Sequence, residues 1–328
     1  MRTRRSASSS SNSVSSSPLL KVTTNPSSAT LVGHKPVLLH EVLQTLAIQT
    51  SDIVVDATLG GGGHAREIVK ALDSSGTFVG LDADSAALER TRTALYAAPS
   101  AAMPKVHLVQ SNFRKLEDVL QPLGIARIDK SLFDLGWSGF QLAAGRGFSF
   151  LADEPLLMTY ADVITPTTLT AEIVVNTWAE SSLADVIYGW GEERNAKRVA
   201  KAIVEAREQA PIKTSKQLAD IVEGVVRRIG KTHPATRTFQ ALRIAVNDEF
   251  GAMKQGLNAA WRMTAKGGRI AVITLHSTED REVKQVMKAW EKAGEARRLT
   301  KSPVVPTRDE IRENPRARSA KLRVVERI

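Results

Sequence analysis

Four short apolar runs stand out in the first half of the chain, each followed by a turn or by a helical pattern. They cover residues 53–59 (IVVDATL), 77–82 (TFVGLD), 105–111 (KVHLVQS) and 130–136 (KSLFDLG). Runs that stay apolar at successive positions are typical of strands buried on both faces of a parallel sheet. Because helical patterns alternate with these runs, the sequence predicts a doubly wound α/β sheet.

The pattern turns helical for nearly a hundred residues after position 140. Segments 171–190 (AEIVVNTWAESSLADVIYGW) and 193–208 (ERNAKRVAKAIVEARE) show it most clearly, and Pro211, Gly230 and Pro234 interrupt it. We interpret this region as a helical domain inserted into the α/β domain.

Strand character returns near the C-terminus, after one more helix. Apolar residues spaced by threes and fours predict a single long amphipathic helix with one stripe facing the core: Phe239, Leu242, Val246, Phe250, Met253, Leu257 and Trp261. Residues 267–277 (GGRIAVITLHS) and 322–328 (LRVVERI) then predict strands that complete the sheet.

Composition narrows the class of protein. The chain has 328 residues, no cysteine and a net charge of +10, which excludes disulfides and thiolate chemistry and suggests a polyanionic partner. Four of the positive charges lie in residues 1–33, a serine-rich tail without acids that we expect to be disordered. No run is apolar enough for a membrane partner, so we expect a cytoplasmic protein. The alternative is a mitochondrial or plastid one, if the tail is a transit peptide.

A run of four glycines marks the most distinctive local motif. The first strand ends in Asp56, and Gly60 to Gly63 and His64 lead directly into a helix. Consecutive glycines accept positive φ and close approach of a ligand, and the helix start offers free N–H groups. Asp82 ends the second strand, where a carboxylate can accept hydrogen bonds from ribose hydroxyls. The motif predicts a nucleotide-like ligand.

The glycine spacing alone leaves two cofactors open. Gly60, Gly62 and Ala65 also satisfy the loose dinucleotide fingerprint of an oxidoreductase, whereas S-adenosylmethionine would place its amino-acid end at the turn. Phe113, after the third strand, offers a ring for stacking on adenine. Asp134 ends the fourth strand, where ligands meet parallel sheets.

Several longer segments resemble the bacterial 16S ribosomal RNA cytosine-N4 methyltransferase family. The matching segments keep the family order from residue 34 to the end: HKPVLLHEVL (34–43), DATLGGGGHA (56–65), GLDAD (80–84), DLGWSGFQL (134–142), RGFSF (146–150), GEERNAKRVAKAIVEAR (191–207), HPATRTFQALRIAVN (233–247), LHSTEDREVK (275–284) and NPRARSAKLR (314–323).

The resemblance implies a class I Rossmann-like methyltransferase with a mostly parallel sheet and an inserted helical domain. It divides the chain into the tail (1–33), a first methyltransferase part (34–140), the helical substrate-recognition domain (141–235) and a second methyltransferase part with a basic C-terminal segment (236–328). It also assigns S-adenosylmethionine as cofactor, bound by Gly62, Gly63, His64, Asp82, Phe113, Asp134 and Gln141.

Two segments depart from the family pattern. Trp137, Ser138, Gly139 and Phe140 replace a small apolar residue, two serines and a proline, and residues 151–162 (LADEPLLMTYAD) lack an expected arginine. These departures concern the substrate-facing loop, so they bear on the target more than on the cofactor.

Methylation of an exocyclic cytosine amine needs a proton acceptor near the nitrogen, because the amine lone pair is delocalised into the ring. We expect Asp134 and His276 to be catalytic. Trp137 or Phe140 could stack on a base taken out of its helix. Ser277 and Asp280 fit a helix capping box.

Basic residues near the C-terminus point to the RNA partner, expected to be 16S rRNA in the small ribosomal subunit. We expect Arg281, Arg316, Arg318, Lys321 and Arg323 to bind its phosphates. No spacing supports a metal site. A homodimer is left open, and so is a non-catalytic RNA-binding factor that retains the fold.

Overall fold

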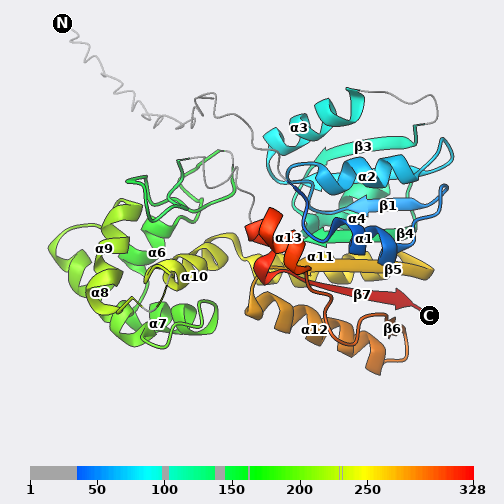
Figure 1. Cartoon of the computed structure of the whole chain (residues 1–328). Helices are drawn as coiled ribbons and strands as arrows, with labels where there is room; N and C mark the ends of the chain where they lie inside the picture. Colours follow the sequence, from blue (N-terminus) through cyan, green and yellow to red (C-terminus); the bar gives the residue numbers. More distant parts are fainter. Residues whose placement is uncertain (1–34, 98–102, 137–144, 162, 229, 231) are drawn as a thin grey trace, which may run out of the picture.

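One mixed sheet forms the centre of the molecule. The computed structural model describes residues 35–97, 103–136, 145–161, 163–228, 230 and 232–328. Within this part, seven strands lie in the order β3-β2-β1-β4-β5-β7-β6 (Figure 1). Their bounds are β1 Ile53–Asp56, β2 Thr77–Asp82, β3 Lys105–Gln110, β4 Ile128–Asp134, β5 Thr264–Thr274, β6 Ala296–Arg298 and β7 Lys321–Arg327. The first five strands in sequence are parallel, and β7 runs antiparallel to both neighbours. The predicted, mostly parallel α/β fold is confirmed.

Helices cover both faces of the sheet, as its apolar strands require. Val54 and Val55 of β1 point to opposite faces and are both fully buried. Val54 belongs to a core shared with helices α1 (Leu39–Leu46), α2 (Gly63–Ala71) and α3 (Ser85–Tyr96). Val55 belongs to a second core, under α4 (Leu116–Leu120), α11 (Glu249–Met263) and α12 (Ser277–Lys292).

The helices between β4 and β5 have a core of their own. They are α6 (Ala171–Thr177), α7 (Glu180–Gly189), α8 (Ala196–Gln209), α9 (Ser215–Val225) and α10 (Thr236–Asn247). Figure 1 shows them as a lobe beside the sheet. Leu183, Val199 and Leu218 are fully buried in this lobe. Phe239 and Leu242 of α10 join the same cluster, so α10 connects the lobe to the sheet.

The prediction of one long helix over residues 239–261 was wrong. The helix breaks at Asp248, which takes a left-handed conformation with φ 47° between α10 and α11. Tertiary hydrogen bonds hold the break: Arg114 Nη2 donates to the carbonyl and the carboxylate of Asp248, and Asn247 Nδ2 donates to the Met158 carbonyl. Spacing along the sequence does not reveal such partners, since they lie far away in the chain.

The C-terminal strand was predicted and the one beside it was not. β7 matches the expected strand at residues 322–328 within one residue at each end. β6 has three residues, two of them arginine, and so carries no apolar run to identify it. Between these strands, α13 (Arg308–Glu313) and the short 3₁₀ helix η3 (Pro315–Ser319) turn back toward α1.

Candidate active site

The glycine turn lies at the carboxyl ends of the parallel strands, on a cavity of about 400 Å³. Gly60 and Gly62 have positive φ values of 51° and 72°, as expected for this motif. A Cβ atom on Gly63 would lie 2.9 Å from Pro36, so this position also needs glycine for close packing. Gly60, Gly61, Gly63 and His64 line the cavity. Gly62 does not: it packs against Thr91 of α3, and its N–H donates to the Leu59 carbonyl.

Asp82 connects the end of β2 to the glycine turn. Its two carboxylate oxygens accept hydrogen bonds from the backbone N–H groups of Gly60 and Asp84, at 2.8 and 2.9 Å. Burial raises the pKa of Asp82 above its ordinary value. Each oxygen keeps a lone pair for another donor, so the carboxylate is fixed in place and can still accept from a ligand in the cavity.

Phe113 borders the cavity from the 3₁₀ helix η1 (Phe113–Lys115) that follows β3. Its ring packs edge-on against Phe133, with centroids 5.8 Å apart. Gly256 of α11 lets this happen, because a Cβ there would lie 2.6 Å from the Phe113 ring. Phe113 is therefore part of the core and part of the cavity wall.

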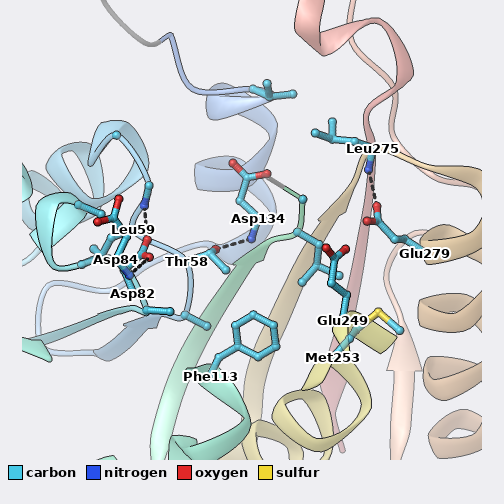
Figure 2. Close-up of a pocket in the computed structure, with 18 of the residues that line it drawn as sticks. Thr58, Leu59, Asp82, Asp84, Phe113, Asp134, Glu249, Met253, Leu275 and Glu279 are labelled. Atoms are coloured by element: carbon cyan, nitrogen blue, oxygen red, sulfur yellow. Dashed lines mark hydrogen bonds between the residues drawn. The ribbon is translucent and has the colours of Figure 1, made fainter. Parts of the chain in front are cut away.

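Asp134 lies between the cofactor-like end of the cavity and its far wall (Figure 2). Its backbone N–H donates to Thr58 Oγ1 at 2.7 Å, and its carboxylate lies 3.9 Å from His64 Nδ1. The other nitrogen of His64 is 3.0 Å from the Val37 carbonyl. Burial, with the nearby carboxylates of Asp56 and Glu279, raises the pKa of Asp134 from 3.8 to about 7. A carboxylate with this pKa can gain or lose a proton near neutral pH.

The far wall comes from residues that the sequence did not single out. Tyr160, Asn247 and Glu249 line the cavity at the break between α10 and α11. The Glu249 carboxylate accepts two hydrogen bonds from the buried guanidinium of Arg243, at 2.7 and 2.9 Å, and one from the Tyr160 hydroxyl at 2.9 Å. No local motif announces this network, since its members come from two separate segments.

His276 also lines the cavity, directly after β5. Burial and the positive charge of Arg243 lower its pKa from 6.5 to about 4, so the ring is neutral at pH 7. Its Nε2 atom is buried and has no hydrogen-bond partner among the described residues. An unpaired polar atom facing a cavity points to a ligand contact.

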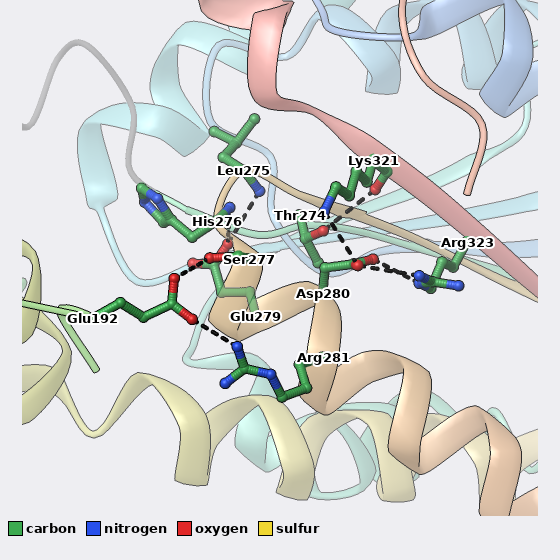
Figure 3. Close-up of polar contacts among 10 residues, drawn as sticks. All are labelled: Glu192, Thr274, Leu275, His276, Ser277, Glu279, Asp280, Arg281, Lys321 and Arg323. Atoms are coloured by element: carbon green, nitrogen blue, oxygen red, sulfur yellow. Dashed lines mark hydrogen bonds and ion pairs between the residues drawn. The ribbon is translucent and has the colours of Figure 1, made fainter. Parts of the chain in front are cut away.

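The predicted capping box was wrong by one residue. Helix α12 begins at Ser277, so His276 is the N-cap, and Glu279 accepts from the backbone N–H groups of Leu275 and His276. Ser277 donates instead to Glu192 of the helical lobe at 2.6 Å. Asp280 binds Arg323, as Figure 3 shows. Burial raises the pKa of Glu279 to about 7.

The predicted RNA-binding residues divide into two groups. Arg323 is only 4% exposed and is bound to Asp280 at 2.6 Å, and Lys321 is 3.4 Å from the same carboxylate. Arg281 pairs with Glu192 at 2.6 Å (Figure 3). The buried pair gives Arg323 a structural role, which corrects its assignment to an RNA surface. Arg316 and Arg318 are exposed and line the cavity.

Some predictions fall outside the described residues or concern absences. Gln141 and the segment from Trp137 to Phe140 lie outside them. Among the residues described, no group of three or more acidic, histidine or cysteine side chains could hold a metal ion. In the same part of the chain, no helix is long and apolar enough to span a membrane.

Comparison with known proteins identifies the family. The MraW methylase family matches residues 31–328. The ribosomal RNA small subunit methyltransferase H of Deinococcus radiodurans is 45% identical over 297 residues, covering 90% of each chain. Proteins of the same name from Symbiobacterium thermophilum and a Paenibacillus species are each 44% identical, covering 90% of this chain and 96% and 99% of theirs. The chain therefore belongs to the MraW methylase family and is a methyltransferase.

Proposed function

We propose that this methyltransferase binds S-adenosylmethionine in the cavity and transfers its methyl group to the N4 amine of a cytosine in 16S ribosomal RNA. The names of its relatives support the small-subunit rRNA substrate. The observation that carries the mechanism is one cavity bordered by both Asp82 and Asp134. It supplies a fixed acceptor for ribose hydroxyls at one side and a titratable acceptor for the reaction at the other.

The charges around the cavity fit this cofactor better than a dinucleotide. Asp82, Asp84 and Asp134 line the side next to the glycine turn. A cationic sulfonium ligand is attracted to this set, whereas the pyrophosphate of a dinucleotide would meet like charge in a poorly solvated site. The apolar Leu59, with Phe113, offers surface for the adenine ring.

The chain's own residues handle the proton of the reaction. When bound, the cofactor supplies an electrophilic methyl group, and the C–S bond breaks as the C–N bond forms. The amine nitrogen becomes positively charged and must lose a proton, and ionised Asp134 accepts it. The hydrogen bond from the Asp134 N–H to Thr58 fixes the end of the strand that carries this carboxylate.

His276 contributes as an uncharged hydrogen-bonding group. Its unpaired Nε2 atom faces the cavity on the side away from Asp82 and can bind the polar edge of the cytosine. The base reaches this position only from unpaired RNA or after leaving its helix. Trp137 and Phe140, outside the described residues, remain candidates for stacking on it.

Methyl transfer from labelled S-adenosylmethionine to small ribosomal subunits that lack the modification tests the proposal. We expect label in a single cytosine with the wild-type protein, and a rate lower by about 100-fold or more with Asp134→Asn. Binding of NADH in place of S-adenosylhomocysteine would favour an oxidoreductase. RNA binding without any cofactor binding would favour a non-catalytic factor.

The proposal carries an expectation about location. Because the substrate is ribosomal RNA, we place the protein in the cytoplasm. The alternative of a transit peptide concerns residues 1–33, which lie outside the described part of the chain. Fractionation of cells that express the full chain with a C-terminal tag distinguishes the two, since a transit peptide would be removed on import.

A further inference from the structure

Charge is unevenly distributed around the cavity. Its acidic side chains are Asp82, Asp84, Asp134, Glu249 and Glu279. Among the described residues, the arginines that line it are Arg316 and Arg318, and no lysine does. Both come from η3, so positive charge is concentrated at one place on the rim. We call these two residues the arginine rim.

The backbone under the arginine rim is held firmly. Asn314, just before η3, is buried, and its side chain donates to the Lys35 carbonyl at 3.0 Å. Ala317, between the two arginines, is fully buried in the core that includes α1 and α2. Glu310 of α13 accepts a hydrogen bond from the Leu38 N–H at 2.7 Å. The two arginines thus project from a fixed segment.

The arginine side chains themselves are available for a ligand. Both are exposed, and neither makes a hydrogen bond or an ion pair with another described residue. Nearby basic residues differ, since Lys321 and Arg323 pair with Asp280 and Arg312 pairs with Asp309. Guanidinium groups present a planar set of donors that suits phosphate oxygens, and two of them at one rim can bind one phosphate together.

We propose that the arginine rim binds the phosphate of the nucleotide whose base enters the cavity. The inference rests on the proposed RNA substrate and adds a specific contact to it. A base held beside Asp134 brings its own phosphate to the rim of the cavity, because sugar and phosphate follow the base. Binding that phosphate there holds the nucleotide out of its helix and offsets part of the cost of unstacking it.

The test compares two double variants with the wild-type protein. Arg316→Ala with Arg318→Ala removes the rim, and Arg308→Ala with Arg312→Ala removes two exposed charges from the adjacent α13 that do not line the cavity. Three quantities are measured: KM for unmodified small subunits, Kd for S-adenosylhomocysteine by calorimetry, and salt dependence of binding to a single-stranded oligoribonucleotide.

We expect the rim variant to raise KM about tenfold or more and to reduce the slope of log K against log salt by about 1.4 for two lost phosphate contacts. Its Kd for S-adenosylhomocysteine should stay within about twofold, and the α13 variant should change none of the three beyond about twofold. Lysine at both rim positions should recover part of the affinity, since it keeps the charge without the planar donors.

Two results would overturn the inference. Unchanged KM and salt slope would show that the arginine rim holds no phosphate. Weaker S-adenosylhomocysteine binding with unchanged RNA binding would show that it holds the cofactor carboxylate instead. If the wild-type protein methylates no RNA, the proposed function fails, while the oligoribonucleotide comparison still decides whether the rim binds phosphate.

Discussion

At the scale of single residues, the site depends on carboxylates that are placed by backbone hydrogen bonds and perturbed by burial. Asp82 and Glu279 each accept from two backbone N–H groups. Asp56 and Asp134 have pKa values raised to about 7, mainly by burial. Such groups are costly without a positive partner, so a cationic ligand stabilises the charged form of the whole set.

Asp82→Ala should weaken binding of S-adenosylhomocysteine by about 1.5 to 3 kcal/mol, because a charged acceptor for ribose is lost and the bond to Gly60 disappears. Calorimetry measures the affinity directly. Asp129→Ala is the matched control, since that carboxylate accepts from the Ile53 N–H at the opposite edge of the sheet. Equal affinity of the Asp82 variant and the wild type would mean that the ribose binds elsewhere.

The rate should depend on pH through Asp134. If its ionised form accepts the proton, kcat/KM rises as the pH increases toward about 7 and levels off above, because burial raises the pKa of Asp134 to about 7 in the free enzyme. The bound cation should lower that pKa, so the rise in kcat should lie at lower pH. His276 has a pKa of about 4 and stays neutral across this range.

Profiles of kcat and kcat/KM between pH 5.5 and 8.5 check this expectation, with Asp134→Asn as the variant that should lose the inflection. A wild-type profile that is flat through neutrality would assign proton removal to another group.

At the scale of elements, the sequence predicted what repeats and missed what depends on distant partners. The buried runs ending at Asp56, Asp82 and Asp134 became parallel strands whose ends share one cavity. The break at Asp248 was missed because its partners, Arg114 and Met158, come from other segments. That break matters, since it brings Glu249 and Asn247 to the far wall.

Gly256→Ala should destabilise the fold by about 1 to 3 kcal/mol and also weaken cofactor binding, because the added methyl group would displace Phe113. Gly224→Ala is the control: it lies in α9 with nothing within 4 Å of the added carbon, so stability should hold or rise by about 0.5 to 1 kcal/mol. Urea unfolding measures both. Equal stability of the two variants would show that α11 and η1 pack less closely than described.

At the scale of the whole molecule, segments far apart in sequence close one cavity. The glycine turn supplies one side, the junction of α10 and α11 the far wall, and η3 part of the rim. The sequence indicated the first of these from local chemistry, and the resemblance to a family supplied the reaction. It could not indicate which C-terminal cations are free, because Arg323 differs from Arg316 only in having Asp280 beside it.

The central claim is that this chain methylates the N4 amine of a cytosine in small-subunit rRNA. Unmodified small subunits are incubated with the purified protein and S-adenosylmethionine, and the RNA is digested to nucleosides for chromatography with mass spectrometry. We predict N4-methylcytidine in the product and none without protein. RNA without added methyl groups, or a methylated cytidine that elutes as the C5 isomer, would contradict it.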